Sequence, residues 1–148
     1  MIDKYKSMVG GLHYMSMTRP DVGYAVNLLS RYLQNPTNLL MDAADRVLSY
    51  LNRTKLLGIR YAADVPIVPV GWSDSAFNDD RATGRSTGGY TIGLKGSGSI
   101  MSATKRIKTV SLSSCEAELK LLTETTQRTC WLRNILEEMH LLPRGPTL

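Results

Sequence analysis

Apolar residues recur at helical spacing in three stretches between residues 5 and 51. Each stretch predicts an amphipathic helix with an apolar stripe along one side. The stripes are Tyr5, Met8, Leu12 and Met15 in the first stretch, Val22, Ala25, Val26, Leu29, Tyr32 and Leu33 in the second, and Leu40, Ala43, Ala44, Val47, Leu48 and Leu51 in the third. An amphipathic helix must cover its apolar side, so each of the three is expected to pack against another element.

Proline and polar residues separate these helices. Pro20 suits the first turn of the second helix, and Asp21 suits the positive end of the same helix. The run Asn35-Pro36-Thr37 is expected to end that helix. The beginning of the chain is therefore predicted to be wholly helical.

The pattern changes near Leu57, where strand signals replace helical ones. Ala63-Asp64-Val65-Pro66 has the composition of a linker, and we place a boundary at about residue 64. Alternating apolar positions and turn residues predict several strands on either side of it. These are a short strand at 58–61, strands at 68–74, 88–94 and 99–103, a hairpin turn at 95–98, and a short extended piece at 110–112.

A long helix is predicted from Ser114 to Met139. Ser113 is its expected N-cap, and Glu116 is expected to reach back to the backbone in a capping box. Three strands and one long helix make the first half of an α/β unit. The expected fold is therefore α+β or α/β, with a helical segment at 1–63 and an incomplete three-stranded sheet plus one helix at 64–148.

Composition narrows the function classes only slightly. The 148 residues carry a net charge of +5, which is compatible with a polyanionic partner without requiring one. No apolar run approaches the roughly 18 residues of a membrane span, and no secretory signal is visible. Cys115 and Cys130 fall on the same predicted helix, too far apart for a disulfide. Unpaired thiols favour an intracellular, reducing compartment, cytoplasmic or nuclear.

Glu118 is the most informative carboxylate in the chain. On the long helix it shares a side with an apolar set: Leu121, Leu122, Thr125, Thr129, Leu132 and Leu136. That side is expected to pack on the sheet, so Glu118 points inward, which is costly unless something compensates its charge. A metal ion is one compensation, and a Lys or Arg at the rim of the core is the alternative. Glu116 lies on a polar side and is expected to act as a cap.

Asp74 is the second candidate. It ends the strand predicted at 68–74, on the same face as Val70 and Trp72. Together with Glu118 it offers the hard oxygen ligands that Mg²⁺ prefers. Two such ions can activate water and stabilise the leaving oxygen in phosphodiester hydrolysis, a chemistry that usually uses three or four carboxylates.

Other charged residues near the strands have simpler interpretations. The run that begins at Asp74 has Asp79 in place of the glycine of a calcium loop and Arg85 in place of its final glutamate. Asp79-Asp80-Arg81 is expected to be a solvated turn. Five basic residues are expected in loops around the strands, where they either contact phosphates or simply keep the protein soluble. They are Arg81, Arg85, Lys105, Arg106 and Lys108.

Eight motifs, in order, resemble copia-type retrotransposon polyproteins, and they cover residues from about 5 to 142. The first four resemble the end of the reverse transcriptase and the last four resemble the start of the ribonuclease H-like domain. They are Tyr5-Lys6-Ser7-Met8-Val9-Gly10-Gly11-Leu12, Thr18-Arg19-Pro20-Asp21, Tyr24-Ala25-Val26, Gln34-Asn35-Pro36-Thr37, Trp72-Ser73-Asp74, Arg85-Ser86-Thr87-Gly88-Gly89-Tyr90, Leu112-Ser113-Ser114-Cys115-Glu116-Ala117-Glu118-Leu119 and Trp131-Leu132-Arg133.

The resemblance implies a ribonuclease H-like fold, Mg²⁺ as cofactor, and cleavage of RNA in an RNA–DNA hybrid. Asp74 matches the family's first catalytic carboxylate and Glu118 matches the second. The implied partners are a hybrid or another nucleic acid and the rest of the reverse transcriptase polyprotein. The intact element would carry this segment in a virus-like particle.

Departures from the family pattern bear on activity. The paired-aspartate polymerase motif and the later carboxylates have no counterpart here, and Ala76, Phe77 and Met101 replace a typical Asp, Trp and Trp. We therefore expect no polymerase activity, weak or absent Mg²⁺ binding and no efficient hybrid cleavage by this chain alone. A non-catalytic, domesticated module that binds nucleic acid or protein is the alternative function, and a decayed reading frame is a further one.

Overall fold

The computed structural model describes residues 1–141, which divide between Ile59 and Arg60 into two compact units. This division lies close to the boundary expected at about residue 64. Each unit has an apolar core of its own. The first unit is helical, and the second consists of a sheet and one helix, so the mixed α and β composition expected from the pattern is confirmed.

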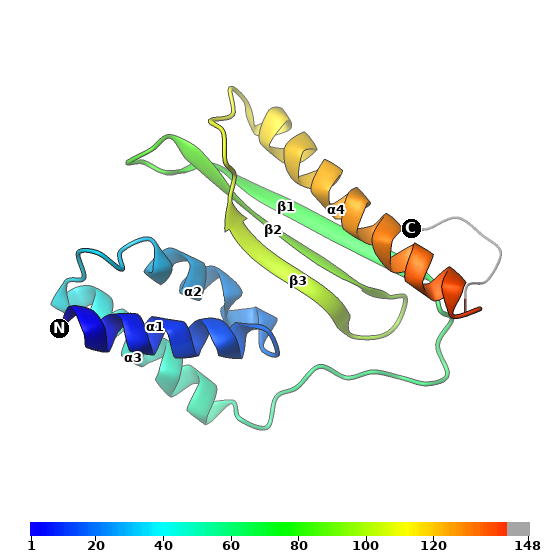
Figure 1. Ribbon diagram of the computed structural model, residues 1–148, viewed down its shortest axis with the longest axis horizontal. Helices are drawn as coiled ribbons and strands as arrows, with labels where there is room; N and C mark the ends of the chain where they lie inside the picture. The colour runs from blue at the N-terminus through cyan, green and yellow to red at the C-terminus, as the bar shows by residue number, and fades with distance from the viewer. Residues whose placement is uncertain (142–148) are drawn as a thin grey trace. The chain divides into compact units, whose positions relative to one another are not determined.

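The first unit contains the three predicted helices (Figure 1). They are α1 (Ile2–Ser16), α2 (Gly23–Ser30), which follows the 3₁₀ turn η1 (Pro20–Val22), and α3 (Asn38–Arg53). Their stripes meet in a core made of Tyr5, Val9, Leu12, Val22, Val26, Leu29, Ala44 and Leu51. Pro20 opens η1, as expected from its fixed φ and missing N–H.

Two expectations for this unit are wrong in detail. α2 ends at Ser30 and does not reach Asn35, because the N–H groups of Arg31 and Tyr32 donate to carbonyls three residues back and tighten the chain into turns. Some stripe residues lie in solvent: Met15, Tyr32 and Leu48 are each at least two-fifths exposed. A stripe drawn from the sequence is wider than the side that two neighbouring helices can cover.

A buried arginine joins the start of η1 to the end of α3. The Arg19 guanidinium donates to both carboxylate oxygens of Asp21 at 3.0 and 2.7 Å, and to the carbonyl oxygen of Thr54 at 3.0 Å. Tyr50 donates its hydroxyl to Asp21 at 2.8 Å and lies under the guanidinium, 5.7 Å from it. The hydrogen bonds from Arg19 hold the pKa of Asp21 below its usual value. The Thr18-Arg19-Pro20-Asp21 run therefore has a structural role in this unit, because it binds the start of η1 to the end of α3.

The second unit is a three-stranded antiparallel sheet covered on one face by a single helix (Figure 1). Its elements are β1 (Pro69–Asp80), β2 (Arg85–Leu94), β3 (Ser99–Arg106) and α4 (Ser114–Glu138). The strands lie in the order β1-β2-β3, so β2 is central. The hairpin turn predicted at 95–98 is confirmed, and Gly96 there has a φ of +78°, which favours glycine.

Two strand predictions need correction. The segment 58–61 forms no strand. Tyr61 and Ala62 contact Ser99 and Ser97 through hydrogen bonds that involve side chains, and so they do not extend a backbone ladder. The first strand continues to Asp80, well past residue 74, because it pairs with β2 along almost its whole length.

Two glycines let α4 lie close to the sheet. A Cβ at Gly88 of β2 would stand 2.7 Å from Leu121 of α4, and one at Gly71 of β1 would stand 3.0 Å from Thr129. The residues that α4 buries against the sheet are Ala117, Leu121, Thr125, Thr129, Leu132 and Leu136. This is the predicted side of the helix with two corrections: Ala117 belongs to it, and Leu122 is half exposed.

Candidate carboxylate site at the edge of β1

Glu118 lies in the first turns of α4 and points toward β1. Its Oε1 accepts hydrogen bonds from the backbone N–H of Ser75 at 3.1 Å and from the Ser75 hydroxyl at 2.8 Å. The helix begins where predicted, because the Ser113 hydroxyl accepts from the N–H of Glu116 at 3.1 Å. The inward direction expected for Glu118 is thus observed, and a serine supplies its hydrogen bonds in place of a Lys or Arg.

The contact with Ser75 places the Glu118 carboxylate at the edge of the sheet. In an antiparallel ladder each backbone N–H points either toward the paired strand or away from it. Because the N–H of Ser75 donates to Glu118, it points away from β2. On that side of β1 the described residues place no strand, so Glu118 occupies an outward N–H of an edge strand.

Asp74 stands beside Ser75 but on the other face of β1. Side chains alternate along a strand, and Gly71 and Ser75 both contact α4, so Asp74 projects to the uncovered face. It is exposed, and its cross-strand neighbour is Gly89, which has no side chain to cover it. The pattern had suggested that the strand ends at Asp74, but β1 continues to Asp80. The sharing of one cation by Asp74 and Glu118 stays a prediction.

The two carboxylates fit Mg²⁺ in ligand type and fall short in number. Both offer hard oxygens. Asp74 is a residue of the edge strand, and Glu118 contacts the next residue of that strand, Ser75. Within residues 1–141, however, no three or more Asp, Glu, His or Cys side chains gather closely enough to hold a metal ion. Two carboxylates are fewer than the three or four that this chemistry usually uses, and a magnesium site here stays a prediction.

Glu116 has the capping role predicted for it, with one difference. Its Oε2 accepts from the N–H of Leu112 at 2.7 Å, one residue before the expected partner Ser113. Its Oε1 pairs with Lys120 one turn along α4, at 2.7 Å. The hydrogen bond from Lys120, followed by that from Leu112, lowers the pKa of Glu116. Glu116 therefore has its own partners on the polar side of the helix, as expected.

The solvated turn expected at Asp79-Asp80-Arg81 is wrong for the two aspartates. Asp80 accepts from the Thr83 hydroxyl at 2.7 Å and from Arg106 at 2.8 Å, and these contacts lower its pKa to about 2. Asp79 accepts from the hydroxyl of Thr87 in β2 at 2.7 Å. Both aspartates belong to the end of β1, because the strand continues that far, and their hydrogen bonds tie it to its neighbours.

Of the five basic candidates, Lys105 and Arg106 lie in β3 and not in a loop. The pairing of Thr87 with Arg106 extends β3 to that residue. Arg106 forms its ion pair with Asp80, and Lys105 forms one with Glu124 of α4. Both therefore have structural partners besides any phosphate.

The other three basic candidates lie at the strand ends. Arg85 is the first residue of β2, whereas Arg81 and Lys108 are in exposed connecting segments, as predicted. Their role as phosphate contacts stays a prediction.

A groove between α4 and β3 was not foreseen from the sequence. It has a volume of about 550 Å³. Lys105 of β3 lines it, together with α4 residues that include Lys120, Glu124, Gln127, Arg128 and Trp131. The available signal was the spacing of Gln127, Arg128 and Trp131 on α4, which puts an amide, a guanidinium and an indole on one side of the helix.

Two further expectations concern the helices. Cys115 and Cys130 are free and exposed, both on α4, as predicted. In the part of the chain that the structure describes, every helix is too short or too polar to cross a bilayer.

Known proteins with similar sequences are named mainly after transposons. The retrovirus-related Pol polyprotein from transposon RE1 of Arabidopsis thaliana is 34% identical over 146 residues, which are 98% of this chain and 10% of the polyprotein. The polyprotein from transposon TNT 1-94 of Nicotiana tabacum is 36% identical over 138 residues, 93% of this chain. The chain thus spans about a tenth of each polyprotein.

A shorter relative has a different name. The secreted RxLR effector protein 161 of Plasmopara viticola is 39% identical over 129 residues, which are 86% of this chain and 90% of the effector. No protein-family model matches the chain. No solved structure matches it either.

Proposed function

The chain belongs to the family of retrovirus-related Pol polyproteins of transposons, and from that premise we propose an ancestral ribonuclease H function for its second unit. Residues 64–148 correspond in this proposal to the first half of a ribonuclease H-like domain. Residues 1–63 correspond to the end of the reverse transcriptase. The ancestral reaction is Mg²⁺-dependent cleavage of the RNA strand in an RNA–DNA hybrid.

The observation that carries this proposal is the position of Asp74 and Glu118. Both match catalytic carboxylates of the family by motif. Asp74 precedes Ser75 in β1, and Glu118 of α4 accepts hydrogen bonds from Ser75. Glu116, only two residues from Glu118, is engaged elsewhere with Leu112 and Lys120. The contacts of the two glutamates agree with the separation of roles expected from helical spacing, and they support Glu118 as the second metal ligand.

Magnesium is the cation that we propose for this pair in the intact element, where it would polarise the phosphodiester and activate water. Two carboxylates balance only half of the charge of two divalent ions, so Mg²⁺ binding to this chain is weak. The contribution of this chain to the reaction is limited to positioning the two carboxylates. Glu118 is held by Ser75, and Asp74 is presented on an uncovered face.

A hybrid-cleavage assay tests the proposal. The chain is incubated with a labelled RNA–DNA hybrid and Mg²⁺, alongside Asp74→Asn, Glu118→Gln and the matched control Glu116→Gln. We expect salt-sensitive hybrid binding by all four proteins and no cleavage above the buffer rate. Cleavage lost with Asp74→Asn and retained with Glu116→Gln would overturn the expected inactivity while supporting the ancestral reaction. A chain that binds no hybrid at low salt would contradict the proposal itself.

A second candidate function is a non-catalytic module that binds nucleic acid or protein. The observation that favours it is the effector relative, a protein scarcely longer than the region it shares with this chain, whose name mentions neither nuclease nor polymerase. The dependence of hybrid binding on Mg²⁺ separates the two candidates. A module without a metal site binds equally well with Mg²⁺ or with a chelator, and Asp74→Asn does not change its affinity.

A further inference from the structure

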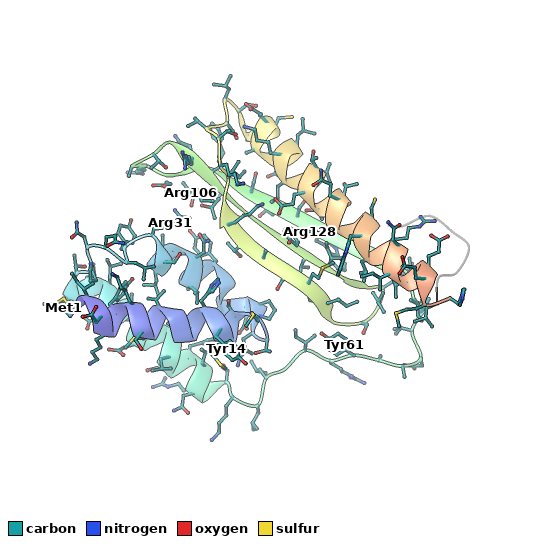
Figure 2. All side chains as sticks on the ribbon, viewed as in Figure 1. Met1, Tyr14, Arg31, Tyr61, Arg106 and Arg128 are labelled. Carbon is teal, nitrogen blue, oxygen red and sulfur yellow. The ribbon has the colours of Figure 1, made fainter. Side chains whose placement is uncertain are left out.

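The groove between α4 and β3 combines positive charge with an exposed aromatic ring. Lys105, Lys120 and Arg128 supply three cations and Glu124 supplies one carboxylate, which is paired with Lys105. Figure 2 shows Arg128 projecting from α4 on the side of β3. The groove is therefore a positively charged surface formed between two elements of the same unit.

The three cations are not equivalent. Lys105 is paired with Glu124, and Lys120 is paired with Glu116 and also donates to Ser111. These ion pairs fix the two ammonium groups at the wall of the groove. Arg128 is exposed and has no hydrogen bond or ion pair within residues 1–141. Its planar guanidinium is thus available for bidentate contact with a phosphate.

Trp131 supplies a stacking surface beside that guanidinium. Trp131 is 53% exposed, although tryptophan has the largest side chain of the standard amino acids. Residues three and four apart are neighbours on a helix, so Trp131 lies next to Arg128 and Gln127. An aromatic face beside fixed cations is the arrangement with which proteins bind single-stranded nucleic acids.

We propose that this groove binds one nucleotide of a single-stranded nucleic acid, with the base stacked on Trp131 and the phosphate held by Arg128. The amide of Gln127, which also lines the groove, is placed to contact the base edge. The choice of nucleic acid rests on the proposed function. The site itself is separate from the carboxylates, because it lies on the β3 side of α4 while Glu118 faces β1.

An acidic peptide is the competing ligand for a basic groove. Carboxylates would satisfy Arg128 and the lysines, but a peptide backbone offers no planar ring to match the exposed indole of Trp131. The groove is open to solvent, and its volume of about 550 Å³ leaves room for a nucleotide unit. The indole therefore favours a base.

Tryptophan fluorescence gives a direct test, since the chain has only two tryptophans. Trp72→Phe leaves Trp131 as the sole indole, and Trp131→Phe leaves Trp72. Both full-length variants are titrated with short single-stranded oligodeoxyadenylate in a chelator. We expect quenching in the Trp72→Phe protein alone, and on the order of tenfold weaker binding for Trp131→Ala. Equal quenching in both variants, or none in Trp72→Phe, overturns the proposal.

A charge-matched pair tests the phosphate contact. Arg128→Gln and Lys95→Gln each remove one positive charge, but Lys95 lies in the β2–β3 turn, outside the groove. Arg128→Gln is expected to reduce the slope of log affinity against log salt by about 0.7, the value for one phosphate on a single strand. Equal slopes for the two variants, or displacement of the oligonucleotide by polyglutamate at matched charge, argues against a nucleotide site.

The same titration separates this inference from the proposed function. Asp74→Asn is expected to bind the oligonucleotide as tightly as the parent chain, because Asp74 lies on the opposite face of the sheet. Loss of binding with Asp74→Asn and not with Trp131→Ala would place the ligand at the carboxylates and refute the groove. Binding that depends on Trp131 supports the groove, even if the chain shows no response to Mg²⁺.

Discussion

Replacing Gly88 with alanine is expected to destabilise the sheet-and-helix unit by about 2 kcal/mol, the usual cost of overpacking a core. The new Cβ would lie 2.7 Å from Cδ2 of Leu121 and 3.0 Å from its Cδ1. Leu121 is 1% exposed, so its side chain has little room to move away. Helix α4 must therefore shift off the sheet or Leu121 must adopt a strained rotamer.

The neighbouring Gly89 provides the matched control. A Cβ there would meet only the Ala103 carbonyl oxygen at 3.6 Å and Thr104 at 3.7 Å, which are ordinary contacts. Gly89→Ala is expected to leave stability unchanged or raise it by about 0.5 kcal/mol through the unfolded state. Urea unfolding followed by tryptophan fluorescence measures both, since Trp72 and Trp131 lie in this unit.

A double-mutant cycle identifies the cause. If contact with Leu121 is the source of the loss, Gly88→Ala combined with Leu121→Ala costs less than the sum of the two single changes. Equal losses for Gly88→Ala and Gly89→Ala, or strict additivity with Leu121→Ala, would show that the close approach of α4 to β2 is not what requires glycine.

Tyr5 is the largest fully buried side chain of the helical unit. This side chain is completely buried, and its hydroxyl donates to the carbonyl oxygen of Leu29 in α2 at 2.9 Å. Burial, with a smaller effect from Tyr32, raises the pKa of the Tyr5 hydroxyl. Tyr5→Ala is expected to cost about 4 kcal/mol, because it removes a buried ring and leaves a cavity between α1 and α2.

Two further tyrosine variants divide that effect. Tyr5→Phe keeps the ring, so only the hydrogen bond to Leu29 is lost, at about 1 kcal/mol. Tyr14→Ala on the same helix is expected to cost little, because Tyr14 is 70% exposed. Native-state hydrogen exchange of the amides in α1, α2 and α3 measures the three variants in this unit directly. A Tyr5→Phe loss as large as that of Tyr5→Ala would assign the stability to the hydrogen bond and not to the ring.

Local signals allowed much of the fold to be predicted. The cap at Ser113, the start of α4 and the glycine turn at Gly96 each depend on residues a few positions apart. The direction of Glu118 also followed from helical spacing, because Leu121 and Thr125, three and seven positions on, belong to the packed side. Such features need no knowledge of distant parts of the chain.

Long-range pairing accounts for the features that were missed. The length of β1 depends on its register with β2, and the pairing of Asp80 with Arg106 joins residues 26 positions apart. The groove at Trp131 exists only because Lys105 of β3 lies opposite α4. Strand alternation places Asp74 and Ser75 on opposite faces of the sheet. The sequence does not state which of these faces α4 covers.

The most direct test of the account is where a divalent cation binds. Mn²⁺, a paramagnetic substitute for Mg²⁺, broadens the amide signals of residues near it in an NMR titration. We expect selective broadening around residues 73–76 and 117–119, only at high Mn²⁺ concentration, and its loss in the Asp74→Asn and Glu118→Gln variants but not in Glu116→Gln. Broadening that gathers instead around Asp79 and Asp80, or that survives both substitutions, would contradict the claim that Asp74 and Glu118 together form a metal site at the edge of β1.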